Sequence, residues 1–355
     1  MNIRSLLISV LTLTSVLLAA CAPAATPPAP AAIPPTGVAT AVQPTIAPSS
    51  VPPTGPTAKP LDEHVIAEWR INLPEDIAFG FDSVWITGHR DPKNTIRIDP
   101  NSNQQIAVIE NTGNRAHSVL VAGDFVWVDG EYYDMAKIDP QTNTIIARVP
   151  GAHTSLAYGF NSIWSTTRND ELDRIDPMSA KITASIKFGD GYVDCNNFVM
   201  VTASAVWVDH CDEGELIKMD PATNSVASKT PYSQLIDQAK AQTKIPEGKA
   251  TDFIWWSVLD ADHPQGCGLL QIDPNTGTGL TFHSVGADCN FPTVTSDAVW
   301  LSGNDQIDRF NPKINQIDKT YKMRQPGIWR LGAGFGSVWV LYEPVGLVQR
   351  LDIAP

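Results

Sequence analysis

Histidine and carboxylate side chains are placed along this chain in a pattern that could support acid–base or metal chemistry. The candidate general bases are His117, His153 and His210. The candidate metal ligands are Asp129, Glu131 and Asp209. Carboxylate oxygens are preferred ligands of Mg²⁺ and Ca²⁺, and histidine is the side chain most often used as a general base. This set would suit a metal-dependent lyase or hydrolase with Mg²⁺ or Ca²⁺ as its cofactor.

A second set of side chains suits ligand binding without catalysis. These candidate ligand-binding residues are His117, His153, Asn196, His210, Asn290, Trp329 and Arg330. Ring nitrogens, amides, an indole and a guanidinium together suit a small polar or cationic ligand. The chain contains no Gly-x-Ser-x-Gly, Walker A or His-Glu-x-x-His motif, so no catalytic residue is assigned. We therefore favour a non-catalytic protein, with no certain cofactor.

A repeated phrase predicts the elements that must position these side chains. Each copy has a tryptophan in a β-rich run, and the seven tryptophans are Trp85, Trp127, Trp164, Trp207, Trp255, Trp300 and Trp339. About a dozen residues later comes a turn residue, usually in Ile-Asp-Pro, and these are Asp99, Asp139, Asp176, Asp220, Asp273, Asn311 and Asp352. A period of about forty residues is typical of repeat architectures.

Each copy predicts four antiparallel strands, with a turn that proline starts and that Asn or Gly completes at positive φ. Four-stranded units repeated radially form a β-propeller. We therefore predict an all-β, seven-bladed propeller at residues 62–355. The last copy lacks its fourth strand and residues 64–71 resemble one, so this N-terminal strand should complete the last blade. An open β-solenoid is the alternative.

Two further features of the repeat have structural interpretations. One tryptophan per blade in the same strand favours packing between blades over stacking on a carbohydrate. The stretched fifth copy contains helix formers at residues 233–243, which predict a short surface helix or a lid.

The front of the chain is predicted to export and tether the folded domain. Residues 1–20 have the basic and apolar parts of a signal peptide and are too short for a confident membrane span. They end in Leu18-Ala19-Ala20, and Cys21 follows directly. This Leu-Ala-Ala-Cys sequence resembles the bacterial lipobox, and the resemblance implies lipidation of Cys21. Residues 21–61 are rich in Pro, Ala and Thr and predict a disordered tether. We expect the protein on the outer face of the cell membrane, held only by its lipid anchor.

Four more cysteines, Cys195, Cys211, Cys267 and Cys289, fall in copies four to six. In an exported protein an even number favours disulfides. We favour the pairs Cys195–Cys211 and Cys267–Cys289, although four cysteines allow three pairings. A zinc site that also uses His210 and His263 is the alternative, although the chain has no Cys-x-x-Cys pair.

The chain is acidic, with a formal net charge of -13. An acidic surface argues against nucleic acid and anionic membrane as partners. It is compatible with a cationic ligand or a divalent metal. The partner is therefore expected to be a small polar or cationic ligand, or an extracellular protein, and the chain is expected to be a monomer.

The Ser-Val-Trp-Val and Ile-Asp-Pro-x-Thr-Asn phrases together resemble the bacterial YVTN and streptogramin-B-lyase-like propellers, from about His64 to the end of the chain. The resemblance implies a propeller fold. It also implies, for the lyases of the group, a metal-assisted elimination with a histidine base and glutamate ligands. The positions where those lyases have Glu are Gly88, Gly130 and His210 here, so no catalytic residue is transferred.

The sequence thus favours a membrane-anchored extracellular propeller that binds a ligand or a partner without catalysis. The alternative is a metal-dependent lyase, virginiamycin-B-lyase-like, or a hydrolase, with its site at the mouth of the central channel. The sequence is compatible with both, and favours the non-catalytic protein.

Overall fold

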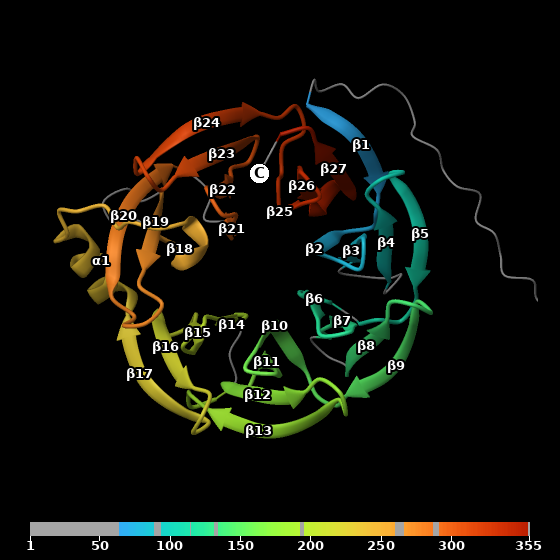
Figure 1. Cartoon of the computed structure of the whole chain (residues 1–355), viewed down its shortest axis with the longest axis horizontal. Coiled ribbons are helices and arrows are strands. Elements are labelled where there is room, and N and C mark those ends of the chain that lie inside the picture. Colours follow the sequence, from blue (N-terminus) through green and yellow to red (C-terminus); the bar gives the residue numbers. More distant parts are fainter. Residues whose placement is uncertain are drawn as a thin grey trace, which may run out of the picture. The chain divides into compact units, whose positions relative to one another are not determined.

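The described residues form a ring of seven antiparallel sheets. A computed structural model describes residues 64–88, 94–113, 115–130, 134–191, 195–259, 266–286 and 291–353. The sheets follow one another around a central axis, and each is one blade (Figure 1). The predicted seven-bladed β-propeller is therefore confirmed. The predicted signal segment and tether lie outside the described residues.

The first three blades contain four strands each, numbered from the axis outwards. Blade one has β2 (Pro74–Gly80), β3 (Ser83–Gly88), β4 (Thr95–Asp99) and β5 (Gln104–Ile109). Blade two has β6 (Val119–Ala122), β7 (Phe125–Val128), β8 (Met135–Asp139) and β9 (Thr144–Val149). Blade three has β10 (His153–Gly159), β11 (Ser162–Thr167), β12 (Glu171–Asp176) and β13 (Lys181–Lys187).

Blades four, six and seven also contain four strands. Blade four has β14 (Phe198–Val201), β15 (Val206–His210), β16 (Glu215–Asp220) and β17 (Ser225–Pro231). Blade six has β21 (Thr293–Val294), β22 (Val299–Ser302), β23 (Gln306–Asn311) and β24 (Gln316–Lys322). Blade seven combines the C-terminal strands with the first strand of the chain: β25 (Arg330–Gly334), β26 (Ser337–Tyr342), β27 (Leu347–Leu351) and β1 (Val65–Arg70).

Blade five differs in detail, because three strands are seen in its described residues. They are β18 (Ile254–Leu259), β19 (Cys267–Ile272) and β20 (Gly279–Gly286). Strand β18 carries the repeat tryptophan Trp255, so it corresponds to the second strand of the other blades. The short 3-10 helix η1 (Ala250–Asp252) precedes it, where the other blades have an inner strand. Blade five therefore presents β18, with its side chains, toward the inside of the ring.

Packing between blades explains why each copy has its tryptophan. All seven repeat tryptophans are at most 3% exposed. Trp85 packs in one cluster with Val119 and Val126 of blade two, and Trp164 packs with Val206 of blade four. Burial of a large aromatic side chain contributes about 2 to 3 kcal/mol or more to folding. The tryptophans are therefore scaffold, as predicted.

The Asp-Pro turns are closed by their own side chains. Asp99 accepts hydrogen bonds from the Asn101 amide at 2.9 Å and from the Ser102 hydroxyl at 2.6 Å. Asn103 then has a φ of 55°, in the left-handed region that Asn tolerates better than most residues. Asn occupies the same left-handed position at Asn143, Asn224 and Asn315.

A basic side chain two residues before such a turn ties neighbouring blades together. In blade three, Arg174 Nη1 donates to the Pro221 carbonyl oxygen at 2.8 Å and to Asn224 Oδ1 at 3.0 Å, both in blade four. Its Nε donates to Ser162 Oγ at 2.9 Å, and its guanidinium lies 5.0 Å from the centre of the Trp164 ring. We call this contact from one blade to the turn of the next blade a turn latch.

Five of the seven seams between blades have a turn latch. The side chains that donate to a carbonyl oxygen of the following turn are Arg97, Lys137, Arg174, Lys218 and Arg350. The equivalent residue of blade five is Gln271, which accepts from Thr281 of its own blade. In blade six it is Arg309, which pairs with two carboxylates of its own blade. Within the described residues, the seams after blades five and six therefore lack the latch.

The predicted closure of the ring is confirmed. Strand β1 pairs antiparallel with β27, and Ala67 lies opposite Arg350 in the register. The Trp69 ring stacks on that of Trp339 with 5.2 Å between centres. Beyond β27, the Asp352 amide donates to the His64 carbonyl oxygen at 2.8 Å. The N-terminal strand therefore covers the edge that the last blade would otherwise expose.

Helix α1 (Tyr232–Lys240) fills the seam between blades four and five. Leu235 and Ala239 are buried in one cluster with Trp207 of blade four and Ile254 of blade five. The helix lies on the outer side of the ring in Figure 1. It is thus the predicted short helix, and it packs between blades instead of covering the channel as a lid. Neither α1 nor the short 3-10 helices seen in the described residues could cross a membrane, given their length and polarity.

Candidate functional site

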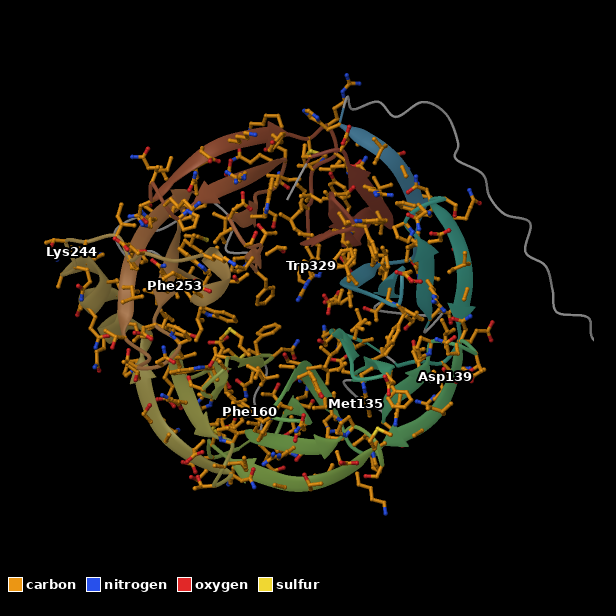
Figure 2. The ribbon with its side chains drawn as sticks, viewed as in Figure 1. Met135, Asp139, Phe160, Lys244, Phe253 and Trp329 are labelled. Carbon is orange, nitrogen blue, oxygen red and sulfur yellow. A yellow bond between two sulfur atoms is a disulfide. The ribbon has the colours of Figure 1, made fainter. Side chains whose placement is uncertain are left out.

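A cavity of about 450 Å³ inside the ring collects side chains from six blades. We call it the channel-mouth cavity. Its lining residues are Glu75, His117, Cys195, Asn196, Phe198, Asp209, Cys211, Trp256, Ser257, Phe291, Trp329, Arg330 and Glu343. Figure 2 shows Trp329 near the axis of the ring. Only blade three contributes no residue to this lining, so the cavity depends on the closed ring.

Three aromatic rings from three successive blades meet at this cavity. Phe198 begins the inner strand of blade four, Trp256 lies in β18 of blade five, and Phe291 precedes β21 of blade six. The ring centres of Phe198 and Phe291 are 4.2 Å apart. Trp256 lies 6.1 Å from Phe198 and 6.0 Å from Phe291. We call these residues the aromatic triad, and each is partly exposed.

Trp256 reaches this position because blade five presents β18 toward the inside of the ring. Trp255 points into the seam between blades and is 3% exposed, and the next side chain of a strand points to the opposite face. The two neighbouring tryptophans therefore have different tasks, one in the scaffold and one in the cavity wall.

An arginine and a histidine of the cavity are each held by a carboxyl group. Arg330 Nε lies 2.7 Å from Asp76 Oδ1. Asp76 is buried, and its other oxygen accepts the Val119 amide of blade two at 2.8 Å. His117 Nδ1 lies 3.1 Å from Glu75 Oε1. The pairs cross the seams between blades seven, one and two, so they fix the cavity wall as well as its charge.

Asp129, a predicted metal ligand, is fully buried beneath the loop that carries His117. Its Oδ1 accepts the Ser118 amide at 3.0 Å, and its Oδ2 has no hydrogen-bond partner among the described atoms. Burial raises the pKa of Asp129 to about 8, although the nearby His117 opposes the shift. At neutral pH the carboxyl group therefore keeps its proton and supports the loop as a neutral group.

Asp209, a second predicted metal ligand, lies in the wall of the channel-mouth cavity. Tyr232 of helix α1 donates its hydroxyl to Asp209 Oδ1 at 2.8 Å. Burial raises the pKa of Asp209 to about 6, and the Tyr232 hydrogen bond limits that shift. The group is therefore mostly ionised above pH 7. The helix thus touches the cavity indirectly, through the carboxylate that it orients.

A second cavity, of about 1000 Å³, adjoins the first. Both cavities are lined by His117, Phe198, Trp256, Phe291 and Arg330. The larger one continues along inner strands, where it is lined by side chains that include Leu156, Met200, Val201 and Ile254. The aromatic triad therefore stands at the junction of the two cavities.

Four of the predicted ligand-binding residues line the channel-mouth cavity: His117, Asn196, Trp329 and Arg330. His153 does not, because it is fully buried with its Nε2 3.2 Å from Asp173 Oδ2. His210 is also buried, between Glu215 and Asp170. The predicted residues Asn290 and Glu131 lie outside the described residues.

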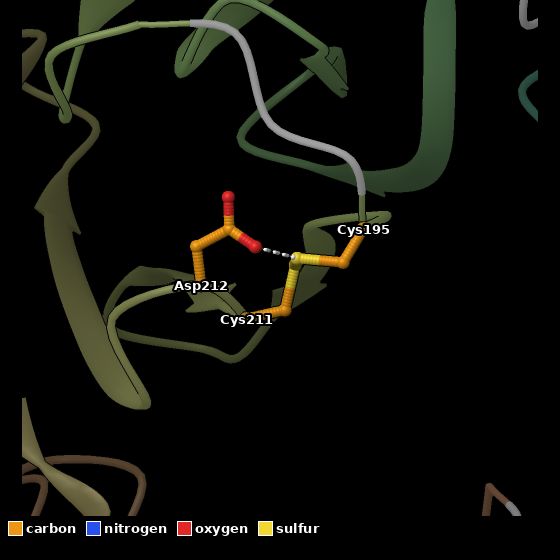
Figure 3. A group of neighbouring side chains, drawn as sticks. All are labelled: Cys195, Cys211 and Asp212. Carbon is orange, nitrogen blue, oxygen red and sulfur yellow. Dashed lines mark hydrogen bonds between the residues drawn. A yellow bond between two sulfur atoms is a disulfide. The ribbon is translucent and has the colours of Figure 1, made fainter.

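The predicted Cys195–Cys211 disulfide is confirmed (Figure 3). Asp212 Oδ1 lies 2.8 Å from the Cys195 sulfur, a close contact, since a disulfide sulfur carries no hydrogen to donate. Cys267 is also disulfide-bonded. Its predicted partner Cys289 lies outside the described residues, so that pairing stays a prediction.

The donors seen in the described residues do not fit a bound metal ion. Only one group of three possible ligands lies close together there, namely Cys195, Cys211 and Asp212. Metal-binding cysteines must be thiolates, and these two sulfurs are bonded to each other. Asp129 and Asp209 belong to no such group among the described side chains. No step through Mg²⁺, Ca²⁺ or zinc is therefore derived from this arrangement.

Sequence reasoning overlooked the aromatic triad. One signal was available at Trp256, which directly follows the repeat tryptophan where other copies have Ile86, Val128, Ser165, Val208, Leu301 or Val340. Another was the pair of similar phrases Cys195-Asn196-Asn197-Phe198 and Cys289-Asn290-Phe291. Each is a departure from the repeat that brings an aromatic ring to the inner edge of a blade.

No protein-family model matches the chain, and no curated protein matches it in sequence. The fold is similar to several solved structures. Hydrazine synthase from Kuenenia stuttgartiensis matches with a TM-score of 0.63 and 9% identity, covering 80% of this chain and 96% of the other. The computationally designed Ika8 protein matches with a TM-score of 0.56 and 12% identity, covering 82% and 98%. BamB from Moraxella catarrhalis matches with a TM-score of 0.54 and 12% identity, covering 81% and 99%. At such low identity these likenesses concern the fold alone, and the chain is a seven-bladed β-propeller.

Proposed function

We propose that this protein is a non-catalytic binding module that holds a small ligand in the channel-mouth cavity. The observation that carries the proposal is the convergence of aromatic and charged side chains from six blades on one cavity of about 450 Å³. Cavities of this size, with apolar walls and a few placed polar groups, are typical of small-molecule sites. A concave site also favours a small ligand over an extracellular protein partner, which would need a broad surface.

The arrangement of the charges supports binding more than catalysis. Histidine and arginine in the cavity are already engaged by carboxylates, in the pairs His117–Glu75 and Arg330–Asp76. The predicted bases His153 and His210 are buried, and each lies within hydrogen-bond distance of a carboxyl group of its own. Groups held in this way position a ligand without a change of structure, and pre-organisation lowers the entropy that binding costs.

The proposal is tested by an unbiased fragment screen, read by ligand-observed NMR, on a chain of residues 62–355. We expect hits whose affinity falls at least about tenfold in a Trp256→Leu variant, since Trp256 stands in the wall of both cavities. The matched control is Phe335→Leu, because Phe335 is 41% exposed and outside both linings. A screen in which no hit depends on Trp256, with the variant still folded by near-UV circular dichroism, would contradict the proposal.

The proposal includes a location on the outer face of the cell membrane, with a lipid on Cys21 as the only membrane attachment. It is supported by the resemblance of Leu18-Ala19-Ala20-Cys21 to the lipobox and by the proline-rich residues that follow. A Cys21→Ser variant should lose its lipid and move from the membrane fraction to the soluble exported fraction. Radiolabelled palmitate incorporation measures the first effect and cell fractionation the second. Unchanged membrane association would overturn this part of the proposal.

A further inference from the structure

The aromatic triad offers ring faces that attract positive charge. The three rings of Phe198, Trp256 and Phe291 lie with their centres 4.2 to 6.1 Å apart. One of them already holds a cation, since the guanidinium carbon of Arg330 lies 5.3 Å from the centre of Phe291. The face of an aromatic ring carries partial negative charge, so the remaining exposed ring surface favours a cationic ligand group.

The charges in the cavity wall also favour a positively charged ligand. Arg330 contacts the Asp76 carboxyl group, and His117 contacts the Glu75 carboxyl group, so neither offers an unpartnered positive charge to the cavity. Two more carboxylates, Asp209 and Glu343, also line the cavity, and the ion pairs seen among the described residues give neither of them a Lys or Arg partner. Burial raises the pKa of Asp209 to about 6, so this carboxylate is mostly charged above pH 7. An anionic ligand would be repelled by this surplus, and a cation would be attracted.

The adjoining cavity indicates what the rest of the ligand is like. The larger cavity begins at the same triad and continues between inner strands, past Leu156, Met200 and Ile254. A ligand with its charge at the triad could therefore extend a body with both apolar and polar groups into this space, since Ser155 and Thr202 line it as well. Alkylated ammonium groups suit the triad better than a bare ammonium, because their surface is apolar and costs less to remove from water.

We infer that the channel-mouth cavity binds a small organic cation, with an alkylated ammonium group against the aromatic triad and facing Asp209 and Glu343. This inference rests on the proposed function of small-ligand binding and names the chemical class of the ligand. The same ammonium chemistry occurs in free metabolites and in lipid headgroups, so the experiment separates these sources.

The probe is choline, compared with its uncharged isostere, in which a tert-butyl group replaces the trimethylammonium group. Isothermal titration calorimetry on residues 62–355 at about pH 7.5 should give at least about tenfold tighter binding of choline. Trp256→Leu should weaken choline binding about tenfold, whereas Trp256→Phe should retain most of it because the ring face remains. Glu343→Gln should weaken choline binding several-fold without affecting the isostere. The matched controls Phe335→Leu and Glu110→Gln, at residues outside the cavity lining, should bind choline as the wild type does.

Equal binding of the isostere would overturn the inference, as would tighter binding of the anion benzoate or choline binding that Trp256→Leu leaves unchanged. If choline does not bind while fragments still bind in a Trp256-dependent manner, the inference fails and the proposed function stands. If no fragment depends on Trp256, the proposed function fails as well. Co-sedimentation with phosphatidylcholine vesicles, compared with phosphatidylglycerol vesicles, separates a lipid headgroup from a free cation as the ligand.

Discussion

A chain that begins at residue 72, and so lacks strand β1, is expected to lose most of its cooperative stability. Strand β1 buries Val65 and Ala67, and the strand is followed by the buried Ile71. Trp69 stacks on the repeat tryptophan Trp339. At about 1.5 to 3 kcal/mol for each large apolar side chain, these contacts contribute roughly 5 kcal/mol, out of the 5 to 15 kcal/mol that keep a typical domain folded. The truncation also exposes β27 as an unpaired edge, which favours aggregation.

The measurement is urea unfolding, followed by tryptophan fluorescence, with residues 62–355 as the matched control. Addition of a synthetic peptide of residues 62–71 should restore much of the lost stability, because it can re-form the pairing with β27. A peptide with Ala67→Asp should not, since Ala67 is buried. Equal unfolding midpoints with and without β1 would show that closure contributes little.

An Arg174→Met variant is expected to be less stable by about 2 to 4 kcal/mol. The substitution keeps the apolar stem over Trp164 but removes the donors to Ser162, Pro221 and Asn224. It leaves partly buried acceptors in two blades without their donors, at about 1 to 3 kcal/mol for each unsatisfied group. Arg174→Lys should recover only part of the loss, because an ammonium group cannot supply the planar set of donors.

Arg309→Met is the matched control, since Arg309 has the same place in the repeat but bonds only within blade six. Its carboxylate partners, Asp297 and Asp318, are 47% and 21% exposed and can be hydrated, so we expect a loss of about 1 kcal/mol or less. The two variants are compared by urea unfolding under the same conditions. Similar losses would show that the turn latch adds nothing beyond a local ion pair.

The repeat made the fold predictable because its physical constraints recur in every copy. A tryptophan such as Trp85 must pack between two blades, and an aspartate such as Asp99 must stabilise a turn. The same residue types therefore recur at a nearly constant spacing. The missing strand at the end of the chain and the spare strand at residues 64–71 then predict closure. Blade five was less predictable. Other structure replaces its inner strand, so the residues there do not repeat the pattern of the other copies.

The site was predicted only in part, because it is built from single residues of different blades. Loop position was enough to place His117, Asn196, Trp329 and Arg330 at one cavity. It was not enough for His153 and His210, since both lie at strand positions where burial beside a carboxylate decides the outcome. Trp256 was hidden by its neighbour Trp255, and only the alternation of side chains along β18 separates their directions.

The two seams without a turn latch make the contacts between blades uneven around the ring. Five seams are tied at the turns, whereas blade six is joined to blades five and seven without that tie. The cavity wall spans the same three blades, through Trp256, Phe291 and Trp329. A molecule bound against all three side chains would bridge these seams from the inside, as the arginine and lysine latches bridge the others at the turns. A ligand in the cavity would then make local opening of blade six less favourable. Slower hydrogen exchange in β21 and β22 would measure this effect.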